Sequence, residues 1–400
     1  MGPPYWVIIV GLGLPLYSYL IYPVVLFILS AVVQVGRDVR YLMSRRDRRS
    51  RTSDTPSVSI VLAAFNEESV IGDTLRRLLE LDYPLDQLEV LVGSDGSTDR
   101  TVEIARSVSS PVIRVMDFPN RRGKAAVVSD CARQARGDLL VFTDANTLLD
   151  TQSLRKLVRH FDNPRVGAVC GELRIVSSDG SPLQEGLYWR YEVMLKILES
   201  RLHGVLGANG AIYALRKELF PQVAENIITD DFVIPMKVQS RGLRVVYDPE
   251  AVATEQATPS VSSEFRRRVR IGAGNWQALW HCAALLLPWK GFVSFAFWSH
   301  KVLRWFTPYL LVAAVVANLF VLQSTVGQVL FLAQLCFYTA AGAGYVLKKL
   351  KLPAGPLSFL SYFVAINTAL GVGLARGAFG AQRAAWRRTD RAHSPERTGR

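Results

Sequence analysis

Long apolar stretches lie near the two ends of this chain, and a region of mixed composition lies between them. Residues 1–36 carry no charged side chain, and the run from Tyr5 to Val33 is almost entirely apolar. This run exceeds the roughly 20 residues that a helix needs to cross a bilayer, so it predicts a membrane span rather than a buried core helix. A cleavable signal peptide would begin with basic residues, whereas here the basic residues follow the apolar run.

Further apolar stretches follow in the last third of the chain. Residues 305–347 are uncharged and have a polar centre at 323–325, which predicts two spanning helices joined by a short turn. Residues 352–375 are also uncharged and predict another crossing. Residues 278–300 mix aromatic side chains with His and Lys, a combination typical of the lipid headgroup zone. We expect an interfacial helix there; the alternative is an ordinary amphipathic core helix.

The region between Thr52 and Arg270 alternates short apolar runs with helical patterns and is long enough for one sizeable core. The predicted strands are 58–64, 88–93, 111–116 and 138–143, and the predicted helices between them are 67–81, 98–107 and 124–136. Alternation of strands and helices indicates a parallel sheet with helices on its faces. Ligands bind such sheets beyond the carboxyl ends of the strands.

Polar clusters follow four of the predicted strands. They are Asn66-Glu67-Glu68, Ser94-Asp95-Gly96-Ser97-Thr98-Asp99, Arg121-Arg122-Gly123-Lys124 and Thr143-Asp144-Ala145-Asn146. Each cluster alone is typical of a turn or a helix cap. Together, on successive strands of one sheet, they predict a crevice in which acceptor groups bind a base and ribose. Cations and a metal ion would bind a diphosphate there.

Charge is concentrated at the edges of the apolar stretches. The chain has 47 Lys and Arg against 34 Asp and Glu, a net charge of +13. Residues 37–51 carry +5, residues 348–351 carry +3 and residues 376–400 carry +5, so the rest of the chain is neutral as a whole. A nucleic-acid-binding protein would need basic clusters in the globular region, so we expect no nucleic-acid partner. The four cysteines have no paired spacing, so they indicate neither a disulfide framework nor a zinc site.

The same charges orient the chain in a membrane. The positive-inside rule places the N-terminus outside and the globular region in the cytoplasm. It also places both basic flanks of 352–375 inside, which one crossing cannot satisfy. Three alternatives remain: this segment is re-entrant or bent at its Pro and Gly residues, or 278–300 also crosses, or one basic flank lies outside.

Six motifs in order resemble those of family 2 glycosyltransferases. They are Ala63-Ala64-Phe65-Asn66-Glu67, Ser94-Asp95-Gly96-Ser97-Thr98-Asp99, Arg122-Gly123-Lys124, Asp144-Ala145-Asn146, Thr229-Asp230-Asp231 and Arg267-Arg268-Val269-Arg270. The resemblance covers about residues 56–280 and is to the membrane-bound branch of cellulose, chitin, hyaluronan and poly-N-acetylglucosamine synthases. It implies an α/β, Rossmann-like fold called GT-A, together with α-helical transmembrane segments.

The resemblance assigns the donor site residue by residue. Ala64, Glu67 and Asp95 would bind the donor, the last two at its nucleoside, and Lys124 would lie along the nucleotide. The family's Asp-x-Asp motif binds ribose, diphosphate and a divalent metal ion. Here it reads Asp144-Ala145-Asn146. Asp144 and Asn146 are therefore the implied ligands of Mg²⁺ or Mn²⁺, although a neutral amide is the weaker ligand.

The resemblance also assigns catalysis and acceptor binding. The family's Thr-Glu-Asp motif supplies the catalytic base, here Asp231, and Asp230 would contact the acceptor or cap a helix. The family's Gln-x-x-Arg-Trp motif binds the diphosphate and the first acceptor sugar. Here Arg267 takes the place of Gln, Arg270 is kept, and Ile271 takes the place of Trp. Trp276 or Trp280 would then supply the aromatic face, or these arginines would form a basic surface near anionic lipid.

These implications define the expected protein. It would be an inverting enzyme of a bacterial-type cytoplasmic membrane that transfers a sugar from a UDP-linked donor to a growing polysaccharide, with translocation of the product. The alternative is addition of one sugar to a lipid-linked acceptor. A transporter without catalysis would carry ionisable residues in its spans, and the uncharged stretches argue against it. The expected partners are donor, acceptor, membrane lipids and an export subunit.

The expected segments follow from these boundaries. They are a first span at 1–36, a basic linker at 37–55, the catalytic domain at 56–270, interfacial helices at 271–301, two or three spans within 302–379, and a basic cytoplasmic tail at 380–400.

Overall fold

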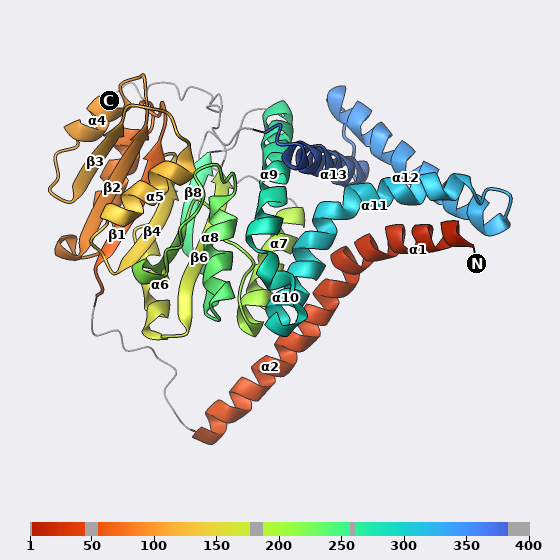
Figure 1. Ribbon diagram of the computed structural model, residues 1–400, viewed down its shortest axis with the longest axis horizontal. Helices are drawn as coiled ribbons and strands as arrows, with labels where there is room; N and C mark the ends of the chain where they lie inside the picture. The colour runs from red at the N-terminus through yellow and green to blue at the C-terminus, as the bar shows by residue number, and fades with distance from the viewer. Residues whose placement is uncertain (1, 45–54, 177–186, 257–260, 383–400) are drawn as a thin grey trace. The chain divides into compact units, whose positions relative to one another are not determined.

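The computed structural model describes residues 2–44, 55–176, 187–256 and 261–382, and these residues form two compact units (Figure 1). The sheet unit contains the described residues of 26–256 together with 281–293. The helical unit contains 2–25, 261–280 and 294–382. Two of the three basic stretches, 37–51 and 376–400, lie mostly outside the described residues, which exclude 45–51 and 383–400.

The sheet unit is built on one mixed sheet of eight strands in the order β3-β2-β1-β4-β7-β6-β8-β5. The strands are β1 (Val58–Ala64), β2 (Leu88–Asp95), β3 (Ile113–Phe118), β4 (Leu139–Asp144), β5 (Thr147–Leu149), β6 (Val166–Val176), β7 (Tyr213–Arg216) and β8 (Arg244–Gln256). The first four neighbours pair in parallel, as the sequence predicts. β7 then lies antiparallel to both β4 and β6, so the direction of the sheet changes at its centre.

Helices cover both faces of this sheet. They are α3 (Ile71–Leu79), α4 (Thr101–Ser107), α5 (Lys124–Gln134), α6 (Ser153–Val158), α7 (Leu187–Leu202) and α8 (Asp230–Ser240). On one face, Val58, Ile60 and Leu62 of β1 belong to the same buried cluster as Ile71 and Leu75 of α3. Alternate side chains of a strand point to opposite faces, so the intervening residues pack on the other side.

Helix α5 covers that other side, against β1 and β2 (Figure 1). The approach is close, because a Cβ added at Gly93 would lie 2.3 Å from Cγ1 of Val127. The absence of a side chain at Gly93 in β2 therefore allows α5 to pack this closely against the sheet.

Helix α3 begins at Ile71, four residues later than the sequence pattern predicts. Asn66 adopts a left-handed backbone with φ of 55°, which a helix cannot include. The backbone N–H of Glu67 donates to Oγ1 of Thr101, and that of Glu68 donates to Asp99. These bonds join β1 to the loop after β2, and the helix begins only after Val70, its N-cap residue, whose φ of −131° is outside the helical range.

Four helices in the described residues are long and apolar enough to cross a membrane: Pro3–Met43, Phe292–Leu319, Thr325–Lys349 and Leu357–Ala378. The first combines α1 (Pro3–Leu16), a π-helical turn at Tyr17–Ile21 and most of α2 (Tyr22–Ser44). The others contain α10 (Phe292–Ala296), a π-helical turn at Phe297–Val302, α11 (Leu303–Leu319), α12 (Thr325–Lys349) and α13 (Leu357–Ala378). Helix α9 (Val261–His281) precedes them.

The helical unit shows how the two uncharged stretches 305–347 and 352–375 fold into helices. The stretch 305–347 is divided as expected, because α11 ends at Leu319 and α12 begins after Ser324, whose hydroxyl accepts from the N–H of Gly327 at 3.0 Å. Residues 357–378 form one uninterrupted helix, so the Gly residues within it do not break it. Gly373 instead packs against α9, where an added Cβ would lie 2.2 Å from the carbonyl oxygen of Val269.

The interval 278–300, in which we expected an interfacial helix, is divided among several elements in the structure. This interval contains the end of α9, 3₁₀ turns at Ala283–Leu286 and Pro288–Lys290, and the start of the span Phe292–Leu319. That span includes two charged residues, Lys301 and Arg304. Both precede the uncharged stretch 305–347 that we identified in the sequence. Arg304 is buried at 5% exposure and donates to the carbonyl oxygen of Ser18 at 3.2 Å, and its guanidinium lies 4.5 Å from the centre of the Tyr19 ring.

Candidate functional site

The polar clusters predicted from the sequence meet at one edge of the sheet. Ala64 pairs with Ser94 at the end of β1 and β2, and Ala63 pairs with Asp144 at the end of β4. The carboxyl ends of these parallel strands therefore bring the first, second and fourth clusters together. The third cluster joins them through a hydrogen-bonded loop.

Asp95 makes that connection. Its side chain is 0% exposed, and it accepts hydrogen bonds from the backbone N–H of Arg122 at 2.7 Å and of Gly123 at 3.0 Å. Gly123 has a φ of 101°, a conformation that favours glycine, and α5 begins at the next residue, Lys124. In this structure the Asp95 carboxylate thus fixes the position at which α5 begins, with Lys124. The predicted contact of Asp95 with a nucleoside stays a prediction.

The first cluster forms the neighbouring wall. Oδ1 of Asn66 accepts from the backbone N–H of Thr98 at 2.8 Å. Beside it, the guanidinium of Arg121 lies 3.7 Å from the centre of the Phe65 ring. Glu67 is buried at 7% exposure and Ala64 at 0%. Glu67 and Ala64 therefore lie at this strand end, and their predicted contact with a donor stays a prediction.

Lys124 and Asp144 form the centre of the site. The ammonium of Lys124 donates to Oδ1 of Asp144 at 2.5 Å, which joins the start of α5 to the end of β4. The hydroxyl of Thr143 donates to the carbonyl oxygen of Ala211 at 2.9 Å and holds the loop before β7 against the same strand end. The change of sheet direction matters here, because an antiparallel β7 starts where β4 ends.

Asp231 enters the same space from α8. Its Oδ2 accepts from the backbone N–H of Gly210 at 3.0 Å. A Cβ added at Gly210 would lie 3.2 Å from both Oδ2 of Asp231 and Nζ of Lys124. A carboxylate and an ammonium therefore both lie close to Gly210, and any side chain at 210 would come into tight contact with both.

Asp231 and Lys124 have pKa values that differ from those of the same residue types at a protein surface. Burial, and then the charge of Asp230, raise the pKa of Asp231 to about 6. Burial opposes the charge of Lys124, but Asp144, Asp230 and Asp231 outweigh it and raise the pKa of Lys124 above its usual value. Asp231 therefore exchanges a proton near neutral pH while Lys124 stays charged, which suits a general base beside a fixed cation.

Tyr213 lies next to these carboxylates and was not singled out by sequence reasoning. Its side chain is 1% exposed, and its hydroxyl has no hydrogen-bond partner in the described parts of the chain. Burial, and then the charges of Asp230 and Asp231, raise the pKa of Tyr213 well above its usual value. The residue begins an ordinary apolar strand, β7, so nothing in the local pattern marks it.

The predicted metal ligands show a mixed arrangement. Asn146 donates from Nδ2 to Oε1 of Glu255 at 2.7 Å, which leaves its amide oxygen as a neutral ligand, and Asp144 shares its charge with Lys124. Among the described residues no group of three or more His, Cys, Asp or Glu is placed to hold a metal ion. Three carboxylates, at 144, 230 and 231, nevertheless surround one ammonium, and this excess of negative charge fits a divalent cation that takes its remaining ligands from phosphate and water.

The remaining predicted residues belong to the helical unit. Arg267, Arg270 and Trp276 all lie on α9. Arg267 is 3.7 Å from Glu264, and the rings of Trp276 and Trp280 meet edge to face at 5.6 Å. Their predicted contacts with donor and acceptor stay predictions.

Comparison with known proteins gives matches of two kinds. Residues 59–223 match the family model for glycosyl transferase family 2. Poly-beta-1,6-N-acetyl-D-glucosamine synthase of Staphylococcus aureus (strain COL) is 26% identical over 271 residues, which are 65% of this chain and 65% of that protein. The synthase of the same name from Staphylococcus epidermidis is 26% identical over 238 residues, 58% of this chain and 57% of its own length.

A solved structure resembles the chain over most of its length. The mannosyltransferase PcManGT from Pyrobaculum calidifontis, in complex with GDP-Man and Mn²⁺, aligns with a TM-score of 0.66 at 22% identity, covering 94% of this chain and 100% of that one. At this identity the likeness shows the fold. The predicted fold class, an α/β GT-A domain with membrane-type helices, is confirmed.

Proposed function

We propose that this chain, whose residues 59–223 match the family model for glycosyl transferase family 2, transfers a sugar from a nucleoside diphosphate donor to an acceptor hydroxyl with inversion at the anomeric carbon. The observation that carries the proposal is the half-buried Asp231, with a pKa raised to about 6, beside the ammonium of Lys124. A carboxylate of this kind accepts a proton at neutral pH, and a nearby cation stabilises a departing diphosphate.

The reaction balances as a single displacement. The acceptor oxygen forms a bond to the anomeric carbon and gives its proton to Asp231, while the bond from that carbon to the diphosphate oxygen breaks. Attack from the side opposite the leaving group inverts the configuration. Lys124 lies on the nucleotide side, as its motif implies, and balances the charge that develops on the diphosphate.

Asp144 and Asn146 would hold a divalent cation, Mg²⁺ or Mn²⁺. Such an ion neutralises charge on the diphosphate when bound. The excess of carboxylates around Lys124 supports this part of the proposal. The remaining assignments, Ala64, Glu67 and Asp95 at the donor and Arg267, Arg270, Asp230 and Trp276 at the diphosphate or acceptor, rest on the motifs.

We favour a UDP-linked donor and a growing polysaccharide as acceptor. The support is the relationship to poly-beta-1,6-N-acetyl-D-glucosamine synthases, which extends over 65% of the chain. Translocation through the helical unit and a cytoplasmic position for the proposed catalytic domain, residues 56–270, belong to the same proposal. The basic residues at 37–51, after the first candidate span, support that orientation.

A second candidate is addition of one sugar to a lipid-linked acceptor. It is favoured by Ile271, which stands where the related motif has Trp and offers no aromatic face for a sugar chain. The four candidate spans in the described part of the chain are also few for a polymer channel.

One experiment tests both candidates. Full-length protein in detergent or nanodiscs is given Mg²⁺ or Mn²⁺ and a panel of UDP- and GDP-linked sugars, with a lipid extract as acceptor source. We expect release of nucleoside diphosphate with one donor only. The labelled product is then sized: a ladder of lengths supports polymerisation, and a single addition supports the second candidate. No release with any donor would contradict the proposed activity.

A further inference from the structure

A cavity lies in the sheet unit, between the C-terminal end of α8 and the segment after α9. It has a volume of about 350 Å³ and is lined by Pro221, Gln222, Met236, Lys237, Ser240, Arg241, His281, Cys282, Ala284 and Leu285. This volume falls within the range of about 300–1,000 Å³ that is usual for small-molecule sites. None of these residues belongs to the candidate transfer site.

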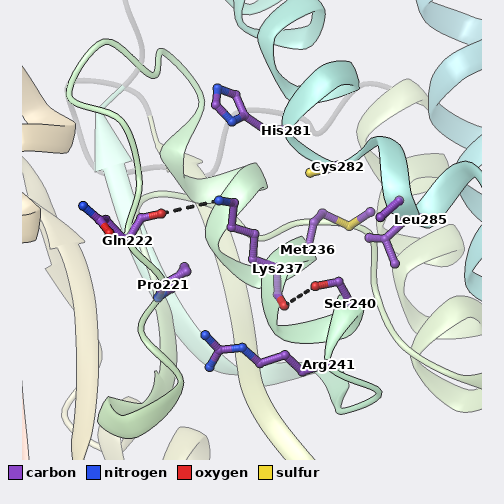
Figure 2. Close-up of a pocket in the computed structure, with 10 residues that line it drawn as sticks. Pro221, Gln222, Met236, Lys237, Ser240, Arg241, His281, Cys282 and Leu285 are labelled. Atoms are coloured by element: carbon purple, nitrogen blue, oxygen red, sulfur yellow. Dashed lines mark hydrogen bonds between the residues drawn. The ribbon is translucent and has the colours of Figure 1, made fainter.

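Positively charged side chains converge on this cavity. Lys237 and Arg241 are four residues apart on and just after α8, so they lie on the same side of the helix. Figure 2 shows Lys237 reaching between Gln222 and His281, with Arg241 on the other side of the opening. The ten lining residues include no Asp or Glu.

The hydrogen bonds that Lys237 and Arg241 donate within the protein use few of their N–H donors. Lys237 donates to the carbonyl oxygen of Gln222 at 3.4 Å, and Arg241 donates to that of Leu219 at 3.3 Å. Neither forms a salt bridge with an acid in the described residues. An ammonium has three N–H donors and a guanidinium has five, so most of them point to solvent or to a ligand.

The cavity therefore presents unneutralised positive charge. Burial, and then the charge of Lys237, lower the pKa of His281, because a second cation nearby disfavours the protonated ring. A bound anion would reverse this effect. A phosphate group suits such a site, because its oxygens accept charge-assisted hydrogen bonds from Lys and Arg together.

The adjoining segment indicates where the phosphate comes from. Trp289 is 74% exposed and Leu287 is 37% exposed, and both follow the cavity-lining residues directly. Lys290 donates to the carbonyl oxygen of Ser240 at 3.2 Å, which fixes this apolar turn to the cavity wall. A candidate membrane span begins at Phe292. An exposed Trp beside Lys at the start of a span is typical of the lipid headgroup zone.

We propose that this cavity binds the phosphate headgroup of an anionic phospholipid, with Lys237 and Arg241 on the phosphate and Trp289 beside the part of the acyl chains nearest the headgroup. The site would hold the sheet unit at a membrane that contains anionic lipid. The proposal is independent of the transfer reaction, because it rests on residues outside the candidate catalytic site.

Lipid binding to the full chain tests the proposal. Purified full-length protein is stripped of lipid in detergent, and phosphatidylglycerol or phosphatidylcholine is titrated while bound lipid is counted by native mass spectrometry. We expect one phosphatidylglycerol to be lost in the double variant Lys237→Gln/Arg241→Gln, with affinity for it reduced about tenfold or more. The matched double variant Arg106→Gln/Lys156→Gln removes the same charge from α4 and α6 and should bind as the wild type does. Equal binding by all three proteins would overturn the site.

A second comparison separates lipid from free phosphate. Glycerol 1-phosphate offers a phosphate group, as a monoester, without acyl chains, and we expect it to compete weakly, at millimolar concentrations. Trp289→Ala should weaken phosphatidylglycerol binding and leave glycerol 1-phosphate binding unchanged. Competition by glycerol 1-phosphate as strong as by the lipid would overturn the lipid assignment. Thermal melting of each variant reports whether it is folded, and no donor is needed, so a failure here is distinct from a failure of the proposed transfer.

Discussion

Asp231 and Lys124 both lie beside Gly210, so that a methyl group at position 210 would be 3.2 Å from both the carboxylate Oδ2 and the ammonium Nζ. The backbone N–H of Gly210 also donates to Asp231 at 3.0 Å. The loop before β7 therefore sets the separation of a proton acceptor from a cation, although it carries neither group itself.

Replacing Gly210 should disturb this separation directly. In Gly210→Ala the new methyl group displaces Lys124 or Asp231 by a few tenths of an ångström or more. We expect the transfer rate to fall about 10- to 100-fold, since small misplacements of reacting groups have effects of that size. Initial rates of nucleoside diphosphate release provide the measurement. Gly342→Ala on α12 has no atom within 4 Å of its added Cβ and serves as the control. Unchanged kinetics in Gly210→Ala would show that the proposed site lies elsewhere.

Asp231→Asn keeps the shape of the side chain and removes its basicity. An amide oxygen still accepts from Gly210 but takes no proton from an acceptor hydroxyl. We expect donor binding, measured by calorimetry, to stay nearly unchanged while transfer falls about 10²- to 10⁴-fold. Asp86→Asn, on the turn before β2, is the matched control and should retain full activity. Substantial turnover by Asp231→Asn would rule out its assignment as the base.

The pH profile links Lys124 to Asp231. Asp231 acts as a base only when ionised, so the rate should fall as the pH drops below about 6. The charge of Lys124 lowers the pKa of Asp231, so its removal in Lys124→Met should move this acidic limb to higher pH. Lys124→Arg keeps the charge and should leave the limb in place. A limb that is identical in wild type and Lys124→Met would argue against their coupling.

Asn146→Asp tests the metal assignment. The substitution provides a second carboxylate but places it opposite Glu255, to which Asn146 now donates at 2.7 Å. Without metal we expect a lower melting temperature, because a hydrogen bond is replaced by two like charges. With Mn²⁺ we expect half-maximal activity at a lower metal concentration than in the wild type, because an acidic oxygen is the stronger ligand. Metal activation that is unchanged in this variant would exclude position 146 from the metal site.

Asp95→Asn tests the loop that precedes α5. The buried carboxylate accepts from two backbone N–H groups, and an amide can replace only one oxygen while directing its own NH₂ at the other donor. We expect a loss of about 2–3 kcal/mol in stability, which thermal melting should show. Asp117→Asn on β3 removes a carboxylate that is 42% exposed and should change little. Wild-type stability in Asp95→Asn would contradict the positioning role described above.

The parallel half of the sheet was predictable because buried parallel strands are continuous apolar runs. β1 was predicted at its observed bounds, Val58–Ala64, and β2 and β4 differ from their predicted bounds by two residues or fewer. The convergence of Asp95, Lys124 and Asp144 followed from the same topology, because parallel strands end at one edge.

Other features depend on contacts that no local pattern records. β7 has four residues and inserts between β4 and β6, so neither its direction nor the position of Tyr213 follows from its own sequence. The pairing of Asn146 with Glu255 joins residues 109 positions apart. Helix α3 starts late because Asn66 takes a left-handed conformation to reach Thr98, which a helical pattern does not show.

The outermost strand pairing of the sheet has a consequence for synthesis of the protein. Among the described residues, β5 (Thr147–Leu149) pairs only with Ala253–Glu255 of β8, and β8 also pairs with β6. A ribosome must therefore add more than 100 residues after β5 before that edge can close, and contacts this distant in sequence form late. The sheet is completed only shortly before the next apolar span, at Phe292, emerges. Folding of the sheet and membrane insertion of the following helices thus follow one another closely in time. A chain that is stopped before residue 244 lacks β8, and it therefore leaves β5 and β6 as open edges exposed to aggregation.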